Sequence, residues 1–176
     1  MIFTQTELAG AYVIEQERRG DARGFFARTF CAEEFKAQGL PTHFVQANTS
    51  LSADAGTLRG LHFQRAPAEE AKLMRCVAGA MWDVIVDIRD GSPTYLQSFG
   101  TELSAENGRQ LFVPKGFAHG FQTLEPDTMA AYMVDEYYTP GVEEGFRFDD
   151  PALGLSWPHK ITTISDKDQN WPLITS

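Results

Sequence analysis

A chain of 176 residues is long enough to bury a hydrophobic core without disulfide bonds or metal ions, and its length favours one domain over residues 1–176. The 43% of hydrophobic residues, with 13 phenylalanines, argue against a disordered protein. A formal net charge of −9 without any run of lysines and arginines argues against a nucleic-acid-binding protein. No stretch approaches the roughly 20 apolar residues that span a bilayer, and the first residues do not resemble a signal segment, so we expect a cytoplasmic protein with no membrane partner.

The first forty residues predict two extended segments and one helix. Residues 11–14 and 24–27 are rich in β-branched and aromatic side chains, with a polar turn between them. The helix is predicted over residues 32–38, because acidic residues stand in its first turn and Gly39 follows it.

The two cysteines, Cys31 and Cys76, fall in the predicted helical region and in a predicted strand. A disulfide bond between them stays open as an alternative. Two buried thiols are the simpler expectation for a cytosolic protein.

From residue 42 onward the chain has the pattern of short strands separated by turn residues. The predicted strands cover residues 42–48, 56–63, 72–78, 80–89, 96–103, 110–113, 118–124 and 128–134. Many short strands at close spacing predict an all-β sandwich or barrel, and a jelly roll is the best single choice. The last thirty residues are rich in turns and aromatic anchors, and we expect them to wrap the barrel or cap its mouth.

The clearest alternation runs over residues 81–88. Its two sets of side chains are Trp82, Val84, Val86 and Ile88 on one face, and Met81, Asp83, Ile85 and Asp87 on the other. This period of two predicts a strand with one buried face.

Residues 58–64 carry the most informative polar groups. Strict alternation places Arg59 with Leu61 and Phe63 on one face of the sheet, and His62 on the other. A histidine, an arginine and a nearby lysine in an apolar-walled pocket suit the removal of a proton from a carbon beside an anionic group. A neutral histidine is the commonest general base near neutral pH and needs an orienting carboxylate, although a single strand histidine is more often structural.

Three further segments carry candidate chemistry, each with a simpler alternative. His119 lies between two glycines, which also fits a tight turn with packed phenylalanines. Tyr132 and Tyr138 share a strand face unless the strand breaks between them, and most strand tyrosines only pack. Residues 165–168 contain two acids, one of which is a candidate partner for His62, but the spacing alone favours a solvated turn.

Metal and nucleotide-cofactor motifs are weak or missing. No second histidine follows His62 closely, and only Glu69, Glu70 and the distant His119 remain as further ligands, so we expect no metal ion. The sequence has no Gly-x-Gly-x-x-Gly, phosphate loop, Gly-x-Ser-x-Gly or Cys-x-x-Cys motif. A dinucleotide oxidoreductase, a nucleotide triphosphatase and a serine hydrolase therefore lose support.

Several motifs in one order resemble a known family. They are residues 58–64, 72–73, 83–89, 91–94, 114–121 and 165–168. From about Asp21 to the C-terminus the chain resembles the dTDP-4-dehydrorhamnose 3,5-epimerase family of sugar-nucleotide enzymes. The resemblance implies an all-β, cupin-type jelly-roll sandwich or barrel with one or two short helices, which works as a homodimer without cofactor or metal. The implied substrate is a nucleotide-diphosphate sugar, specifically a deoxythymidine diphosphate sugar with a ketone at carbon 4.

The resemblance also implies residue roles. His62 is the general base, Asp168 is its carboxylate partner, Tyr132 is the acid on the opposite face of the sugar, and Lys72 lies near the ketone oxygen. The implied substrate-binding residues are Arg23, Phe26, Arg28, Gln46, Asn48, Arg59, Lys72, His119, Tyr138, Glu143 and Lys167. Arg23, Arg59 and Lys167 are the cations expected to meet the diphosphate.

The chain departs from the family pattern at two positions. Arg28 stands where the family usually has glutamate, and Ala47 stands where it usually has aspartate. Both changes are expected to make the entrance to the site more positive while leaving the acid–base residues intact. They leave open the sugar, the nucleotide and the number of carbons inverted.

The expected reaction is the inversion of carbons 3 and 5 of a 4-keto-6-deoxy sugar. Within the same chemistry, a mono-epimerase acting at one of these carbons is the closest alternative. A 3,4-ketoisomerase-type cupin, a metal-dependent cupin and a non-catalytic sugar-nucleotide-binding module are the remaining alternatives.

Overall fold

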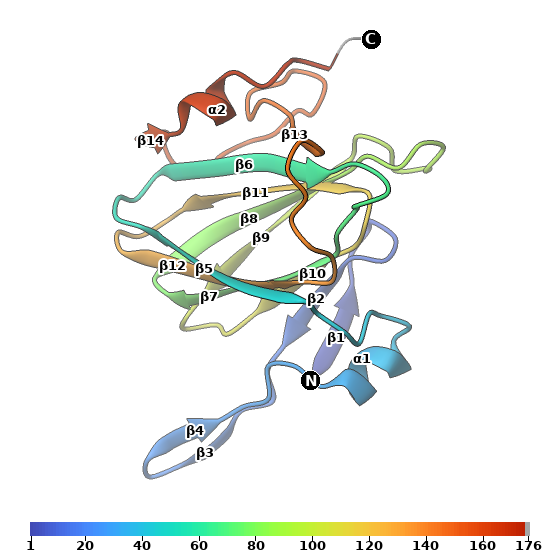
Figure 1. Ribbon diagram of the computed structural model, residues 1–176. Helices are drawn as coiled ribbons and strands as arrows, with labels where there is room; N and C mark the ends of the chain where they lie inside the picture. Colours follow the sequence, from blue (N-terminus) through green and yellow to red (C-terminus); the bar gives the residue numbers. More distant parts are fainter. Residues whose placement is uncertain (175–176) are drawn as a thin grey trace.

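Two β-sheets, antiparallel except for the parallel pairing of β14 with β6, face each other across the hydrophobic core in the computed structural model, which describes residues 1–174 (Figure 1). The first sheet has the strand order β1-β2-β10-β7-β12-β5, and the second has the order β13-β6-β11-β8-β9 with β14 beside β6. The elements are β1 (Ile2–Gln5), β2 (Tyr12–Glu15), β3 (Arg19–Asp21), β4 (Gly24–Phe26), α1 (Ala32–Ala37), β5 (Gln46–Ser52), β6 (Thr57–Gln64), β7 (Lys72–Ala78), β8 (Ala80–Asp87), β9 (Ser98–Ser104), β10 (Gln110–Val113), β11 (Phe117–Thr123), β12 (Thr128–Val134), β13 (Glu143–Gly145), β14 (Thr163–Ile164) and α2 (Asp166–Gln169). The predicted all-β sandwich with two short helices is confirmed.

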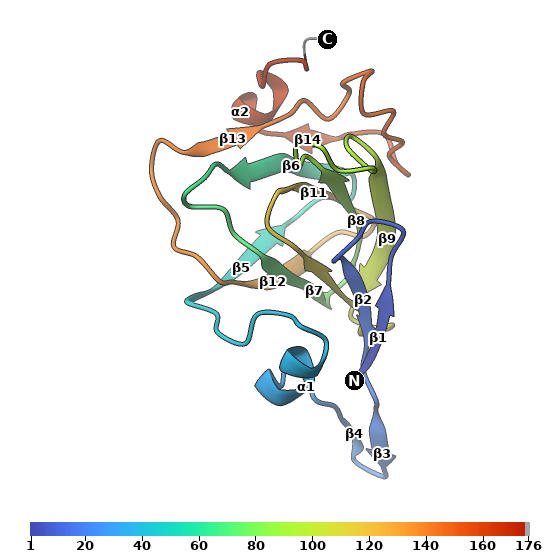
Figure 2. The ribbon, with the colours of Figure 1, turned by 90° about the vertical axis from the view of Figure 1, so that its right-hand side faces the viewer.

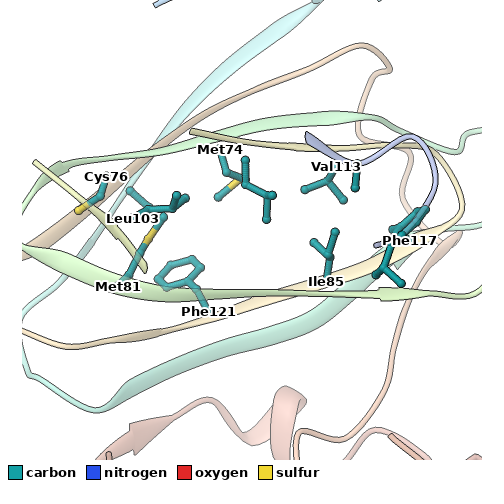
Figure 3. Close-up of a cluster of buried hydrophobic side chains, with 12 residues drawn as sticks. Met74, Cys76, Met81, Ile85, Leu103, Val113, Phe117 and Phe121 are labelled. Atoms are coloured by element: carbon teal, nitrogen blue, oxygen red, sulfur yellow. The ribbon is translucent and has the colours of Figure 1, made fainter. Parts of the chain in front are cut away.

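The core between the two sheets is built from the inward-facing apolar residues of both. Met74 and Cys76 of β7 meet Met81 and Ile85 of β8 and Phe121 of β11 (Figure 3). Alternate side chains of a strand point to the same face, so each strand contributes every second residue to this core. Burial of these apolar side chains holds the sheets together.

Helix α1 packs on the first sheet through an aromatic cluster. Phe35, the one buried residue of α1, makes edge-to-face contacts with Phe112 of β10 and with Phe30 and Phe44 in the segments that flank the helix. Such edge-to-face pairs are favoured by the charge distribution of the rings. The helix ends one residue earlier than predicted, with Gln38 as its C-cap.

The C-terminal segment covers the outer face of the second sheet, as predicted from its turns and aromatic anchors. Leu153 packs against Leu61 and Val86, and the ribbon from β13 to α2 lies over β6 (Figures 1 and 2). Strand β8 is therefore buried on both faces, with Ile85 in the central core and Val86 under the C-terminal segment. The prediction of a single buried face is wrong because a non-strand segment supplies the second cover.

Most predicted strand bounds agree with the structure within two residues. The strands over residues 72–78, 110–113 and 128–134 have the predicted bounds. The exception is the strand predicted over residues 42–48, which is observed as β5 (Gln46–Ser52). Phe44 packs into the aromatic cluster of α1 instead of continuing the strand. The short elements β1, β3, β13, β14 and α2 were not predicted, because two to four residues show no periodicity.

The hairpin formed by β3 and β4 projects from the sandwich on the side away from α2 (Figures 1 and 2). All six of its strand residues are exposed, including Phe25 and Phe26 with 57% and 69% of their surface accessible. Arg18 covers one face of the Phe25 ring at 4.5 Å. This hairpin carries two of the predicted substrate-binding residues, Arg23 and Phe26.

Both cysteines are free thiols. Cys76 is buried, and its sulfur lies 3.0 Å from the Ala78 carbonyl oxygen; burial raises the pKa of this thiol. Cys31 is the N-cap residue of α1 and is only half-buried, so the expectation of two buried thiols holds for Cys76 alone. Among the described residues, no helix has the length and hydropathy to cross a membrane.

Candidate active site

A cavity of about 470 Å³ opens between the two sheets. It is lined by Arg59 and His62 of β6, Lys72 and Met74 of β7, His119 and Phe121 of β11, Tyr132 of β12, and Lys167 and Asp168 of α2, among others. A smaller adjoining cavity of about 140 Å³ shares His62, Lys72 and Tyr132 with it and adds Gln46, Asn48, Glu70, Tyr138 and Glu143. The structure thus brings together four predicted catalytic residues and most of the predicted binding residues.

A β-bulge in β6 places Arg59 and His62 on the same wall of this cavity. His119 of β11 pairs with His62, whereas Phe121 pairs with Arg59, so an advance of three residues along β6 matches an advance of two residues along β11. The extra residue reverses the alternation, and the prediction that Arg59 and His62 face opposite sides is wrong. Gly60 permits the bulge: its φ is +118°, and a Cβ there would lie 2.6 Å from the Cα of Gly120.

His62 and Asp168 form a hydrogen-bonded pair, although they are 106 residues apart in the chain. The Nε2 atom of His62 lies 2.5 Å from Oδ1 of Asp168, which leaves Nδ1 as the free ring nitrogen. The buried carboxylate also accepts hydrogen bonds from the Gly60 N–H and the Trp171 indole N–H. Burial opposes ionisation, but the hydrogen bond with His62, and after it the one from the Gly60 N–H, hold the pKa of Asp168 below its ordinary value.

Helix α2 delivers Asp168 to this position. The hydroxyl of Ser165 is the N-cap and accepts a hydrogen bond from the Asp168 backbone N–H at 3.1 Å. The segment 165–168 is therefore the first turn of a helix, and the simpler interpretation as a solvated turn is wrong for Asp168, which is 3% exposed.

Tyr132 faces the same cavity from the other sheet. It lies on β12 opposite Asn48 of β5 and Met74 of β7, in the wall across from β6. Burial raises the pKa of its phenol, and the negative charge of Glu70 adds to this shift. An imidazole and a protonated phenol thus line one cavity from facing sheets.

Lys72 is the buried cation of the cavity. Only 8% of the residue is accessible, and its Nζ lies 3.0 Å from Oε1 of Glu70. From the sequence Glu70 was a candidate metal ligand only, and its ion pair with Lys72 was not predicted. The two-residue spacing of Glu70 and Lys72 was the signal for this ion pair, because a carboxylate two residues before a buried lysine is a candidate counter-charge.

His119 is held by a second buried carboxylate. Its Nε2 atom lies 2.5 Å from Oδ1 of Asp83, a residue with no exposed surface on β8. The other oxygen of Asp83 has no hydrogen-bond partner among the described residues. The interpretation of His119 as part of a simple turn is wrong. The missed signal for Asp83 was its place on the same strand face as Met81 and Ile85, which predicts a buried acid that needs a partner.

A polar group lies at the mouth of the cavity. Lys167 Nζ lies 2.6 Å from Oε2 of Glu143, and the Tyr138 hydroxyl donates to the same oxygen at 3.4 Å. The hydrogen bond with Glu143 raises the pKa of Lys167. The Gln46 side chain accepts from the Tyr138 backbone N–H. Strand β12 ends before Tyr138, so strand parity with Tyr132 does not place it.

Arg23, Phe26 and Arg28 do not reach this cavity within their own chain. Arg23 lies on the projecting hairpin with 89% of its side chain exposed and pairs with Asp21. Arg28 pairs with Glu34 of α1 at 3.0 Å. Ala47 lies in a separate depression on the outer face of the first sheet. The expectation that both sequence departures make the entrance more positive is therefore wrong for the chain's own cavity.

No metal-ligand cluster is found in residues 1–174, where no three histidine, cysteine, aspartate or glutamate side chains gather closely enough to hold an ion. Two of the weighed ligands have other partners: His119 pairs with Asp83, and Glu70 pairs with Lys72.

Comparisons with known proteins agree with this geometry. The family model described as dTDP-4-dehydrorhamnose 3,5-epimerase matches residues 5–176. The chain belongs to this family. A protein from Sinorhizobium fredii named dTDP-4-dehydrorhamnose 3,5-epimerase is 47% identical over 176 residues, which cover 99% of this chain and 90% of that relative. The resemblance noted in the sequence is confirmed, and the chain is an isomerase of this type.

Solved structures of family members have the same fold. The Bacillus anthracis dTDP-4-dehydrorhamnose 3,5-epimerase, determined with TDP and PPi bound, is 46% identical with a TM-score of 0.95, covering 98% of this chain and 99% of that one. ChmJ, a 3'-monoepimerase from Streptomyces bikiniensis in complex with dTDP-quinovose, is 34% identical with a TM-score of 0.88, covering 96% and 85%. The predicted cupin-type sandwich of this epimerase family is confirmed.

Proposed function

We propose that the chain inverts carbons 3 and 5 of a dTDP-linked 4-keto-6-deoxy sugar. The observation that carries this proposal is the placement of His62 and Tyr132 on facing walls of one cavity. Inversion needs the proton to leave from one face of the sugar and a proton to return to the other, so a single base cannot perform both steps.

The ketone at carbon 4 acidifies the hydrogens on carbons 3 and 5. Nδ1 of His62 removes one of these protons, and the electron pair moves onto the ketone oxygen as an enolate. The Asp168 carboxylate stabilises the resulting imidazolium and fixes its orientation. Tyr132 then returns a proton to the carbon from the opposite side, and each such acid–base group is typically worth about 10²–10⁴ in rate.

The enolate oxygen needs a nearby positive charge, and Lys72 supplies it. Its ammonium group is buried in the cavity, where an electrostatic contact is stronger than in water. The proposed reaction moves protons between side chains and substrate without net oxidation, so we expect it to need no cofactor.

Binding of the nucleotide diphosphate is assigned to the mouth of the cavity. Arg59 and Lys167 are the cations that line it, and His119 lies on the same wall as Arg59. Gln46, Asn48, Tyr138 and Glu143 line the adjoining space. The ligands of relatives support a nucleotide-binding site, since the Bacillus anthracis enzyme was determined with TDP and ChmJ with dTDP-quinovose.

A homodimer completes the site in this proposal. The resemblance assigns Arg23 and Phe26 to substrate binding, yet both are exposed on a hairpin that projects away from their own cavity. A second copy would receive this hairpin at its cavity, where Arg23 would meet the substrate and the two phenylalanines would lose their exposure to water.

The second candidate function is a mono-epimerase that inverts only one carbon. The similarity to ChmJ favours keeping it, because a 3'-monoepimerase shares this fold. One acid–base pair serves either reaction, and the outcome depends on how the sugar ring is presented to it.

Incubation of the purified protein with dTDP-4-keto-6-deoxyglucose in deuterated water, followed by NMR, tests the proposal. Deuterium at carbons 3 and 5 with an inverted product is the expected result. Exchange at one carbon alone would favour the mono-epimerase, and a carbonyl moved to carbon 3 would favour a ketoisomerase. A folded protein that binds the nucleotide sugar without any exchange would be a binding module, and the proposal would be wrong.

A further inference from the structure

Glu70 is an acid inside the cavity that none of the roles above uses. It precedes β7 in the loop between β6 and β7, and only 13% of its side chain is exposed. It lines the adjoining cavity together with His62, Lys72 and Tyr132. A largely buried carboxylate beside the reacting groups changes the charge of the site and requires an explanation.

The loop that carries Glu70 is held firmly on both sides. The Gln64 side-chain N–H₂ donates to the Ala68 carbonyl at 3.0 Å and lies 3.4 Å from Oε2 of Glu70. The Ala71 backbone N–H donates to Oδ1 of Asp135 at 2.7 Å. These bonds hold the loop that places the Glu70 carboxylate beside Lys72.

The Lys72 ammonium group is therefore anchored by Glu70. Oε1 of Glu70 lies 3.0 Å from Nζ and supplies the counter-charge for a cation that is 8% exposed. An ammonium group has three N–H donors, so one bond to Glu70 leaves two for a ketone oxygen. An anchored ammonium group does not have to be reoriented when the enolate forms, which is how preorganised sites lower a barrier.

We infer that Glu70 is a positioning residue for the epimerase reaction: it holds the Lys72 ammonium group toward the substrate oxygen. This inference rests on the proposed function. It goes beyond the acid–base set, because Glu70 acts through Lys72 and not on the sugar itself.

The effect on Tyr132 gives a readout that a merely structural residue would not move. The charged and titratable groups that line the joined cavities with Tyr132 are Arg59 and His62 on β6, Glu70 and Lys72 at β7, His119 on β11, Glu143 on β13, and Lys167 and Asp168 on α2. After burial itself, Glu70 is the largest cause of the raised pKa of Tyr132; Arg59 opposes it and Glu143 adds to it. Removing the negative charge of Glu70 lowers that pKa, so the alkaline limb of the rate profile moves to lower pH.

Glu70→Gln is the primary test, because it removes the charge and keeps the shape. We expect kcat to fall about 10- to 100-fold with KM changed less than about threefold, since the lost positioning acts on the enolate-forming step. We also expect the alkaline limb of the kcat profile to move to lower pH. The matched control is Glu69→Gln, which neutralises the neighbouring acid, for which no ion pair is found among the described residues, and should change neither quantity.

A double-mutant cycle shows whether Glu70 acts through Lys72. Glu70→Gln should cost little further rate when it is added to Lys72→Met, with solvent deuterium exchange as the assay. If Glu70→Gln lowers the melting temperature strongly, Glu70→Asp replaces it in the test, because it keeps the charge and should retain the wild-type alkaline limb.

The turnover of the wild-type protein distinguishes a failure of the proposed function from a failure of the role assigned to Glu70. No turnover of the keto-sugar nucleotide by the wild type contradicts the proposed function itself. Normal wild-type turnover, with Glu70→Gln matching it in kcat and in the alkaline limb, overturns only the role of Glu70. Full additivity with Lys72→Met would also overturn it.

Discussion

Replacing Asp168 by asparagine tests the buried carboxylate that orients the proposed base. The two oxygens of Asp168 accept three hydrogen bonds, from His62 and Trp171 at Oδ1 and from the Gly60 backbone at Oδ2. An asparagine side chain has one oxygen and one N–H₂ group, so it cannot accept on both sides.

Each orientation of the asparagine leaves a specific defect. With its oxygen toward His62, the N–H₂ group meets the Gly60 N–H, and two donors oppose each other. With its N–H₂ group toward His62, Nε2 must accept, the ring proton moves to Nδ1, and the base cannot take a proton from the sugar. We expect kcat/KM to fall by about 10²–10⁴, the range of a lost general base. The unsatisfied buried donor should cost about 1–3 kcal/mol of the free energy of unfolding.

Steady-state kinetics and thermal unfolding measure these two effects. Because the pKa of Asp168 is lowered in the folded state, its ionisation stabilises the protein above the unfolded-state pKa and this contribution is lost as the pH falls through the folded-state pKa. The melting temperatures of wild type and Asp168→Asn should therefore begin to converge as the pH falls below about 4, the ordinary pKa of an aspartate, and converge fully only below the lowered folded-state pKa. Asp166→Asn, an exposed acid in the same turn, is the control and should change neither measurement. Asp168→Asn activity within about threefold of wild type would refute the assigned role.

Three further outcomes follow from the geometry. Tyr132→Phe should retain solvent deuterium exchange while inverted product falls by about 10², and unimpaired inversion would remove Tyr132 from the mechanism. Gly60→Ala should lower the unfolding free energy by at least about 2 kcal/mol, because its Cβ would meet the β11 backbone at 2.6 Å, whereas Gly91→Ala, with open space around it, should cost about 1 kcal/mol. If each subunit of the dimer lends its hairpin to the other, co-expression of inactive Arg23→Ala and inactive His62→Ala subunits should restore about one quarter of the active sites. Half of the dimers are then hybrids, and one site in each hybrid has both an intact His62 and an intact Arg23. No recovery of activity would contradict the shared site.

Local patterns in the sequence predicted the strands well and failed where tertiary contacts decide. Strands β7, β10 and β12 have their predicted bounds because alternation and turn residues act over a few neighbouring positions. Strand β5 begins later than predicted, because Phe44 finds a better partner in the aromatic cluster of α1. The second cover of β8 comes from Leu153, which no local pattern links to that strand.

In the candidate active site, too, local patterns succeeded and features set by tertiary contacts were missed. Motif resemblance identified His62 and Asp168 as partners, but nothing local in the sequence brings together two residues 106 positions apart. The bulge at Gly60 places Arg59 on the same face as His62, which strict alternation did not predict. A bulge arises from the pairing of two strands, so the sequence of one strand does not show it. The ion pair of Glu70 with Lys72 and the hydrogen bond of Asp83 with His119 were not predicted, because both depend on the three-dimensional arrangement of the strands.

The most direct test of the account is solvent exchange by His62→Ala. Wild-type protein and the variant are incubated with dTDP-4-keto-6-deoxyglucose in deuterated water, and NMR follows deuterium at carbons 3 and 5. The account predicts incorporation by the wild type and loss of incorporation at both carbons by a folded His62→Ala variant. Exchange by the variant at the wild-type rate would contradict the claim that this imidazole removes the proton.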